Sequence, residues 1–527
     1  MTAATGTGTL TRFSLRLGRF RIGTWVLALA LMTWAIGLSL NRLYPTAASR
    51  EQLAKLADSP ALRAILGPLL APTSTGGLIA WREGAVLAVL LSLATTFLVV
   101  LRTRGEEQSG RAAVIAACPV GRSATALSAM QVAAVLDASA GAAIALALVA
   151  LSQPVGDSIL FGLALALIAW SFGAIAALAS QVLSSSKAAN GCAAGAVAVS
   201  YLLLALGQLR EAWLIWLTPI GWLGKVRPFF EPRPAVLVIP LAVGLLTAGV
   251  AAWLAAAREH GRGLRAEPRA RRMRPVRSVA GLAWRLERVV VAVTMVVALV
   301  YSALVGSMVG YFRSFATSSP EFAKAIERLG GTRVLEDGFT TFMMLFGGIA
   351  MAGWGVSLVL RLHAEEESGR SEFVLASGAT RERTYGGFVA TAMATAVAGT
   401  VLWGFGLGIG RALADHRIDS LWRSLSAGLV TVPAVVVVVA AAGLLIGLGS
   451  RYGVLAWVVV VWCAIVTVLG AFFDAPQFVK DLSPFTHVPP IPLPAGAWEP
   501  CVLLLSVGVL LLAAGLAAYQ RRSISGS

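Results

Sequence analysis

Charged side chains are scarce in this chain. Asp, Glu, Lys and Arg make up 13% of its 527 residues, against about 25% in soluble domains. Hydrophobic residues make up 57%, and the mean hydropathy is +0.78. So little charge leaves no segment of domain size from which a soluble core could be built. We therefore predict an all-α polytopic membrane protein, since helices satisfy their own backbone hydrogen bonds inside a bilayer.

Lysine and cysteine are also rare. None of the five lysines stands in the pattern G-x-x-x-x-G-K-[ST], whose backbone amides cradle phosphates. The four cysteines, Cys118, Cys192, Cys463 and Cys501, lack metal or redox spacing. The sequence also lacks a nucleophilic triad and paired carboxylates. We therefore predict no catalytic residue, no metal site and no cofactor in this chain, so its energy source would be another chain or an ion gradient.

Long apolar runs are abundant. Twelve are about 20 residues or longer, the length that a helix needs to cross a bilayer. Positive residues gather on one side of these spans, and the positive-inside rule makes that side cytoplasmic, with both chain ends inside. Topology and anionic lipid thus explain the net charge of +17 better than nucleic acid does. The predicted spans are 24–41, 80–101, 124–151, 158–183, 189–209, 235–257, 289–312, 339–360, 385–410, 425–449, 454–473 and 500–519.

Several features recur in the second half of the chain. Each half has a sizeable external loop after its first span and a proline-bearing external segment between its fifth and sixth spans. Six spans per half give both halves the same orientation, as in a parallel repeat. Alternatively, the first span is a cleaved signal, since Pro45-Thr46-Ala47-Ala48 faintly suggests a cleavage site. The predicted parts are an amphipathic cytoplasmic connecting helix (1–23), a first six-helix domain (24–257), a basic linker (258–288), a second six-helix domain (289–519) and a cytoplasmic tail (520–527).

One charged segment occurs twice, at an offset of 259 residues. Residues 101–122 read LRTRGEEQSGRAAVIAACPVGR, and residues 360–381 read LRLHAEEESGRSEFVLASGATR. Each copy predicts a short helix parallel to the membrane, at 106–117 and 365–376, with its glutamates in the first turn, where the helix dipole favours anions. A repeated cytoplasmic helix indicates two docking sites for soluble partners; a solvated loop that merely records a duplication is the alternative. The predicted coupling residues are Arg102, Glu106, Glu107, Gly110, Arg111 and Arg122, with Arg361, Glu365, Glu366, Gly369, Arg370 and Arg381.

These residues carry a family resemblance over almost the whole chain. The segments Arg102-x-Arg104-x-Glu106-Glu107-x-x-Gly110-Arg111, Pro119-Val120-Gly121-Arg122 and Thr218-Pro219-Ile220-Gly221-Trp222, in this order, resemble the fused permease subunits of ABC-2-type exporters. Within these, the chain resembles specifically the actinobacterial polyketide-antibiotic or tetronasin-type exporter permeases. Leu43-Tyr44-Pro45, Arg227-Pro228-Phe229 and the second-half Glu365-Glu366-Glu367-Ser368-Gly369-Arg370 extend the match.

The resemblance implies a bacterial cell-membrane exporter of lipophilic small molecules. A coupling helix between the second and third spans of each half would dock one of two copies of a separate ATP-binding subunit, which would bind ATP and Mg²⁺. The segment between spans five and six would dip into the outer leaflet, and the amphipathic N-terminal helix would connect ATPase and membrane domain. The second copy departs from the first by His363, Glu367 and Glu372 and by lacking the Pro119–Gly121 turn. The two docking sites are therefore expected to be unequal.

Residues inside the spans suggest where a substrate would pass. Asp137 is the one ionisable residue well inside a predicted span, and it could recognise a cation, move a proton, act in gating, or simply hold helices together. By resemblance, spans two and five of each half line the central cavity, and their aromatic and methionine side chains suit lipophilic ligands and packed helices equally. The predicted path residues are Phe97, Tyr201, Phe342, Met343, Met344, Phe346, Trp457 and Trp462.

Two other classes of protein compete with this interpretation. An ion-coupled twelve-helix secondary drug transporter would require paired intramembrane charges, and the loop between spans two and three lacks the pattern G-x-x-x-D-R-x-G-R of the major facilitator class. A membrane enzyme acting on lipids would require clustered His, Asp or Glu at the membrane surface, and the sequence lacks such a cluster. An ATP-driven exporter remains the favoured prediction.

Overall fold

In the computed structural model every regular secondary-structure element among the described residues is a helix. The described residues are 4–58, 63, 66–112, 117–209, 212–257, 278–307, 309, 332–367, 369–469, 477–489 and 498–522. Most of the predicted linker, most of the second external loop and the end of the predicted tail lie outside these ranges. So does the middle of the first predicted coupling helix, residues 113–116.

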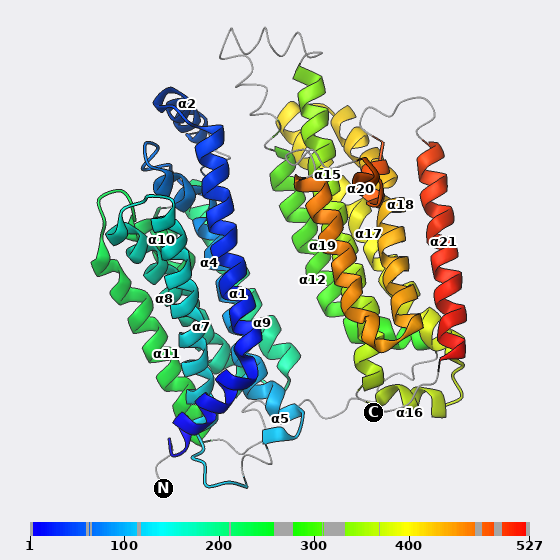
Figure 1. Cartoon of the computed structure of the whole chain (residues 1–527), viewed down its shortest axis with the longest axis horizontal. Coiled ribbons are helices and arrows are strands. Elements are labelled where there is room, and N and C mark those ends of the chain that lie inside the picture. Colours follow the sequence, from blue (N-terminus) through cyan, green and yellow to red (C-terminus); the bar gives the residue numbers. More distant parts are fainter. Residues whose placement is uncertain are drawn as a thin grey trace. The chain divides into compact units, whose positions relative to one another are not determined.

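The chain forms two compact units, Met1–Arg271 and Arg272–Ser527. In Figure 1 the first unit runs from blue to green and the second from green to red. Each hydrophobic core draws all of its buried residues from one unit. The described part of each unit therefore closes its own core.

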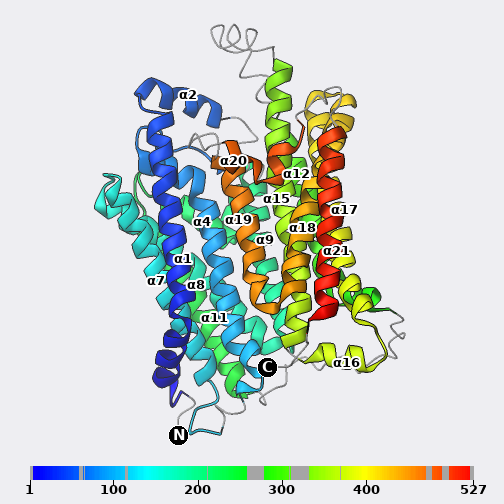
Figure 2. The same ribbon diagram turned by 45° about the vertical axis from the view of Figure 1, so that its right-hand side comes forward.

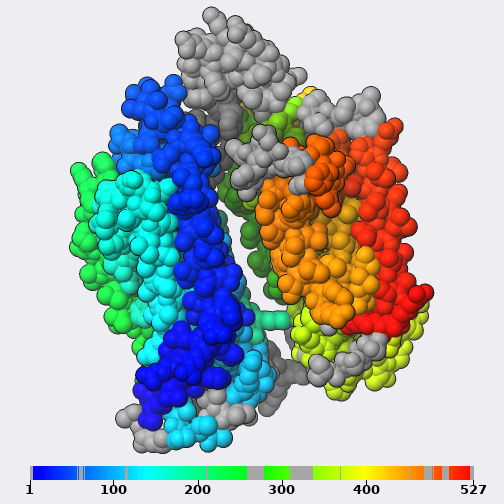
Figure 3. Space-filling model, in the orientation of Figure 1, coloured from blue at the N-terminus to red at the C-terminus, as the bar shows by residue number. Residues whose placement is uncertain are grey.

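Six long helices build the described part of the first unit. At its centre α8 packs against α4, α7, α9 and α11, while α1 packs on α7 and α4. Figure 3 shows α1, in dark blue, running the height of the visible face of this unit. The long helices are α1 (Thr7–Leu43), α4 (Thr75–Val100), α7 (Ala124–Ala150), α8 (Val155–Val182), α9 (Ser186–Leu209) and α11 (Val238–Ala257). The short ones are α2 (Ala47–Ala57), η1 (Leu101–Gly105), α5 (Glu106–Gln108), η2 (Ala212–Leu217), α10 (Pro219–Val226) and η3 (Pro234–Leu237).

The described part of the second unit also contains six long helices, with a packing pattern of its own. Its α17 and α18 are central, because α17 packs on α12, α15 and α18, and α18 also packs on α21 and α19. The long helices are α12 (Val279–Ser307), α15 (Thr332–Glu367), α17 (Arg381–Asp415), α18 (Asp419–Leu448), α19 (Gly453–Leu469) and α21 (Trp498–Arg521). The short ones are α16 (Arg370–Ala376), η4 (Ser450–Tyr452), α20 (Gln477–Asp481) and η5 (Pro484–His487).

Eleven of the described helices are long and apolar enough to cross a membrane. Each coincides with a predicted span, so a polytopic helical membrane protein is confirmed. The predicted span 454–473 falls on α19, which has 17 residues, and residues 470–476 lie outside the described ranges. The twelfth span and the parallel six-plus-six repeat thus remain predictions.

The N-terminal helix differs from what the sequence suggested. We expected a connecting helix over 1–23 and a separate span from 24, but α1 continues without interruption from Thr7 to Leu43. No proline interrupts this stretch. Gly18 lies within the helix, where its missing side chain leaves room for the guanidinium of Arg102. Phe13, Leu17 and Phe20 are exposed, whereas Ser14 and Gly18 are buried against the unit. The apolar face of this segment therefore points away from the described bundle, toward where lipid would lie.

Close glycine contacts set the spacing of several helices. A Cβ on Gly141 of α7 would lie 2.4 Å from the carbonyl oxygen of Gly162 on α8, and one on Gly410 of α17 only 1.8 Å from that of Ala303 on α12. Such positions let backbones touch, which is how small residues drive helix association in membranes.

Candidate functional site

The repeated segment lies at the end of the second long helix of each unit. In the first unit α4 continues as the π-helical turn η1 and the short helix α5, so that one helix runs from Thr75 to Gln108. In the second unit α15 continues to Glu367. Gly110 and Gly369 follow with φ of +76° and +69°, a left-handed conformation that ends helices.

This placement corrects the predicted position of the glutamates. We expected Glu106, Glu107, Glu365 and Glu366 in the first turn of a helix parallel to the membrane, but they lie in the last turns of the preceding helices. Helix formers continue without proline up to the glycine, so the helix ends only there. Carboxylates at a helix C-terminus oppose the helix dipole, and nearby arginines must therefore stabilise them.

Two arginines brace the first copy. The Arg102 guanidinium lies 3.1 Å from Glu106 and donates to the carbonyl oxygen of Ser14 on α1 at 3.1 Å. Arg104 lies 2.6 Å from Glu107 and donates to the carbonyl oxygens of Ser180 and Gln181 at the end of α8. The end of α4 is thereby fastened to both α1 and α8.

The second copy is braced by residues distant in the sequence. Arg361 pairs with Glu287 of α12 and lies 3.6 Å from Glu365, which also binds Arg370 at 2.6 Å. His363 replaces Arg104 and lies 3.3 Å from Glu367.

Another arginine therefore serves Glu366 in the second copy. This carboxylate pairs with Arg522 and accepts a hydrogen bond of 2.8 Å from the Tyr519 hydroxyl of α21. Arg381 in turn donates to the carbonyl oxygens of Gln520 and Arg522. The end of α15 is thus fastened to α12 and α21.

The glutamates are poor candidates for direct contact with another protein. Their side chains are 14% (Glu106), 9% (Glu107), 12% (Glu365) and 6% (Glu366) exposed, and all four are paired. Arg111, Arg122, Arg370 and Arg381 are exposed, and so is Gly110, while Gly369 is partly buried. The surface that a partner could touch is therefore the segment after each helix end.

The short helix α16 presents such a surface in the second unit. It lies crosswise at the end of its unit in Figures 1 and 2, next to the ends of α15 and α17. Phe373 on α16 is 79% exposed. A cavity of about 870 Å³ opens beside it, lined by Val374, Ser377 and Gly378 with the first residues of α12 and α17. The predicted helix 365–376 is thus partly right: its second half exists as α16.

The predicted path residues lie where the sequence put them, on α4, α9, α15 and α19. Met344 is buried, and Tyr201 and Met343 are partly buried against the cores. The other five are between 37% and 47% exposed within their units. No cavity described in either unit has any of the eight in its lining. They stay predictions.

Asp137 sits at the midpoint of α7 and is 1% exposed. Its Oδ1 accepts a hydrogen bond of 2.5 Å from the Thr95 hydroxyl of α4, and its Oδ2 has no hydrogen-bond partner among the described residues. It lines a cavity of about 700 Å³ on the surface of the first unit.

The sequence analysis missed a buried charge network in the second unit. Arg411 lies 3.3 Å from Glu336, 3.0 Å from Asp337 and 3.5 Å from Asp415, and all four are almost fully buried. Arg423 adds a 2.8 Å contact to Asp337. The signal was present as the i,i+4 pairs Arg411/Asp415 and Asp419/Arg423 on either side of one turn. We read the network as a brace of α15, α17 and α18, because its charges are paired and stand at helix ends.

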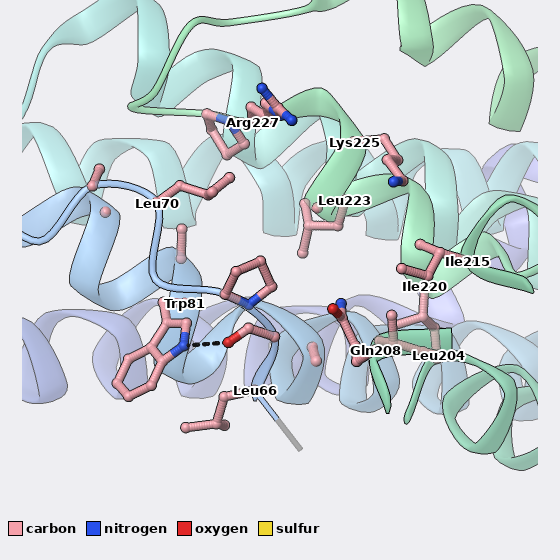
Figure 4. Close-up of a pocket in the computed structure, with 18 residues that line it drawn as sticks. Leu66, Leu70, Trp81, Leu204, Gln208, Ile215, Ile220, Leu223, Lys225 and Arg227 are labelled. Atoms are coloured by element: carbon pink, nitrogen blue, oxygen red, sulfur yellow. Dashed lines mark hydrogen bonds between the residues drawn. The ribbon is translucent and has the colours of Figure 1, made fainter. Parts of the chain in front are cut away.

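A small pocket marks the corresponding end of the first unit. It measures about 170 Å³ and lies between the loop at Leu66–Ala71, Trp81 and the short helix α10 (Figure 4). The Trp81 indole donates to the carbonyl oxygen of Gly67 at 2.8 Å. Lys225 stands at the pocket, where burial and then the charges of Arg227 and Arg233 lower its pKa.

The segment before α11 contains the short helix α10, and its dip into the outer leaflet stays a prediction. The Thr218 hydroxyl accepts a 2.9 Å hydrogen bond from the Gly221 amide, and Pro219 opens α10. With eight residues, α10 is too short to cross a bilayer. Its buried side chains pack it on α8 and α9.

Known proteins resemble this chain along its whole length. The family model described as the C-terminal domain of the multidrug efflux system permease Rv1217c matches residues 9–253 and 276–520. The multidrug efflux system permease protein Rv1217c of Mycobacterium tuberculosis is 31% identical over 525 residues, which cover 99% of this chain and 95% of that protein. Each matched segment falls within one compact unit.

Proposed function

Since the chain belongs to the multidrug efflux permease family of Rv1217c and is a multi-pass protein of the cell membrane, we propose that it is the membrane subunit of an ATP-driven exporter. It would work with two copies of a separate ATP-binding subunit and would itself hydrolyse nothing. The finer assignment to the fused ABC-2-type permeases, with twelve spans in two parallel repeats, belongs to the same proposal. The observation that carries it is the charged motif repeated at the end of one membrane helix in each unit.

The ion pairs give the motif a mechanical role. A partner seated on the segment after Gly110 pushes on the end of α4, which Arg102 and Arg104 fasten to α1 and α8. A partner on α16 pushes on the end of α15, which Glu287 and Arg522 fasten to α12 and α21. Closure of the two ATP-binding subunits would therefore move three helices in each unit as one body, and such rigid-body shifts are common in transport switches.

The two docking sites, at the ends of α4 and α15, are unequal in this proposal. The first moves α1 and α8, whereas the second moves α12 and α21 and presents the exposed Phe373. The family match over residues 9–253 and 276–520 supports the repeat on which this rests. Coupling is a free energy shared between sites. Because the two helix ends are joined to different helices, we expect ATP-driven motion at the two docking sites to affect the membrane helices unequally.

The docking surface can be tested with one substitution. Phe373→Glu places a charge on α16, and we expect a candidate ATP-binding subunit from the same genome to co-purify several-fold less well. Phe478→Glu on α20 is the matched control, because Phe478 is 69% exposed and α20 belongs to the predicted external side. Capture and substrate-stimulated ATPase activity are measured together. Equal capture by Phe373→Glu and wild type, with unchanged ATPase activity, contradicts docking at α16.

The energy source needs a separate experiment. In inside-out vesicles containing both subunits, we expect ATP to drive drug uptake and a proton gradient without ATP to drive none. Uptake driven by the gradient alone would instead favour the ion-coupled transporter. That alternative has one observation behind it, the buried carboxylate of Asp137 within a span.

A further inference from the structure

A single buried carboxylate stands beside an apolar groove in the first unit. The groove holds about 700 Å³ between α7 and α8, with Leu241 of α11 at its edge. It begins where Gly141 and Gly162 bring the two backbones into contact. The α7 side of the groove is formed by small, exposed side chains, namely Ala134, Ala138 and Ala142. Asp137 is one helical turn from Gly141, so it lies at the bottom of this groove.

One oxygen of Asp137 is left without a partner. Thr95 satisfies Oδ1, whereas Oδ2 has no hydrogen-bond partner among the described residues, although the side chain is 1% exposed. Buried polar atoms are nearly always paired, because an unpaired one loses its hydration without compensation. The groove is otherwise apolar, and among the described residues of its lining Asp137 is the one ionisable side chain.

An aromatic ring completes the surroundings. Trp170 of α8 also lines the groove, and its indole N–H donates to the carbonyl oxygen of Met130 at 3.3 Å, which holds the ring in place. The ring packs further on Gly244 of α11. A carboxylate and an aromatic ring around one apolar space suit a cation, since the ring adds cation–π attraction.

We propose that this groove binds lipophilic ammonium compounds. The ammonium donates a hydrogen bond to Oδ2 of Asp137 beside Trp170, and the apolar body of the compound fills the groove between α7 and α8. This binding requires Oδ2 of Asp137, which is buried without a partner, to face the groove that the residue lines. This names a substrate class for the efflux activity, so it rests on the permease role but is independent of any coupling to ATP.

The second unit offers no equivalent carboxylate. At the offset of 259 residues that relates the motif copies, Asp137 corresponds to Ala396 and Thr95 to Trp354. Ala396 is fully buried in the core of its unit. The ammonium site would therefore occur once per chain, in the first unit.

The test uses two probes that differ in one charge. Dansylcadaverine carries a primary ammonium, and its N-acetyl derivative has the same fluorophore and chain without the charge. Binding of each to the full chain in lipid nanodiscs is measured by fluorescence anisotropy, without ATP or a partner subunit. We expect wild type to prefer the amine, and Asp137→Asn to bind it about tenfold more weakly, the loss expected for a charge-assisted hydrogen bond. Binding of the acetylated probe should change less than twofold.

Two further variants keep the outcome decisive. Glu83→Gln neutralises another buried carboxylate, on α4, that does not line the groove, and it should leave both affinities unchanged. Ala138→Phe fills the groove while keeping Asp137, and it should weaken the binding of both probes.

Equal binding of the two probes by wild type, or unchanged amine binding by Asp137→Asn, overturns the proposal. Binding no stronger than to empty nanodiscs also overturns it and would leave the groove to lipid acyl chains. If Asp137→Asn does not fold, two results decide the matter: whether wild type prefers the amine over the acetylated probe, and whether Ala138→Phe weakens binding of both probes.

Failure of this site and failure of the ATP-driven mechanism remain distinguishable. Loss of amine preference with intact ATP-driven transport removes only the ammonium site. Retained amine binding without ATP-driven transport removes only the proposed coupling.

Discussion

At the scale of single residues, position 363 shows how one substitution redirects an ion pair. Arg104 neutralises Glu107 from within the same helix, three residues away. The second copy has His363 at that place, and the cation for Glu366 comes instead from Arg522, just beyond α21. The carboxylate is retained in both copies while its partner changes. What the motif preserves is therefore a paired carboxylate at the helix end.

Removing Arg522 should expose this dependence. Arg522→Ala leaves Glu366 buried without its cation, and we expect a loss of about 1–3 kcal/mol in stability. Thermal stability is measured by size-exclusion chromatography after heating, and the double variant with Glu366→Gln should recover most of the loss. Arg521→Ala, at the exposed neighbouring residue, is the control. An Arg522→Ala protein as stable as this control would contradict the pairing.

Sequence comparison within the chain found these residues but not their neighbours. The motif stood out because nine of its residues are identical at one offset. Ser14, Ser180 and Arg522 carried no such signal, because the first two contribute backbone carbonyls, which every residue has. Their roles depend on tertiary packing that brings segments up to 156 residues apart into contact.

At the scale of elements, helix existence was predictable and helix ends were not. Every predicted span coincides with a helix, because hydrophobicity over about 20 residues is a strong signal. The ends of α4 and α15 were misplaced, because the charged residues suggested the start of a separate helix parallel to the membrane where the membrane helix in fact continues. Ion pairs within the helix and to its neighbours allow that continuation. The connecting segment was predicted as a separate helix, and its continuation into the first span in α1 was missed.

Helix packing in the second unit depends on a glycine contact. In Gly410→Ala the new Cβ would lie 1.8 Å from the carbonyl oxygen of Ala303 and 2.7 Å from the Ser307 nitrogen. Backbone atoms cannot rotate away, so α12 and α17 must separate, at about 1–3 kcal/mol. We expect a melting temperature several degrees lower. Gly386→Ala in the same helix meets no atom within 4 Å and should be neutral or slightly stabilising. Equal melting temperatures for the two variants would rule out a tight α12–α17 contact.

At the scale of the whole molecule, the chain behaves as two units with separate cores. All residues of each core cluster come from one unit, and the family match divides at the same place. The repeated motif and the spacing of the spans predicted a joint in the linker 258–288, and the division into two six-helix domains stays a prediction. Asp137 was anticipated as an isolated charge within a span, whereas the buried Arg411 network at a helix end of the second unit was not.

Separate cores predict separate folding. We expect residues 1–271 and 272–527, produced as two chains, each to give a monodisperse peak with its own cooperative thermal transition. Tryptophan fluorescence during heating provides the measurement. A half that aggregates alone but recovers when both are co-expressed would show that its core needs the other half.

The Asp137 groove has an evolutionary consequence. In an exporter assembled from two identical subunits, any mutation appears at both symmetry-related places, and a carboxylate in the membrane interior would be introduced twice. In this chain the corresponding positions have separate codons, so Asp137 can coexist with Ala396. If the two halves are a fused repeat, as proposed, the second half can keep an apolar alanine where the first has a carboxylate. Substrate range in such chains can therefore diversify through one half at a time.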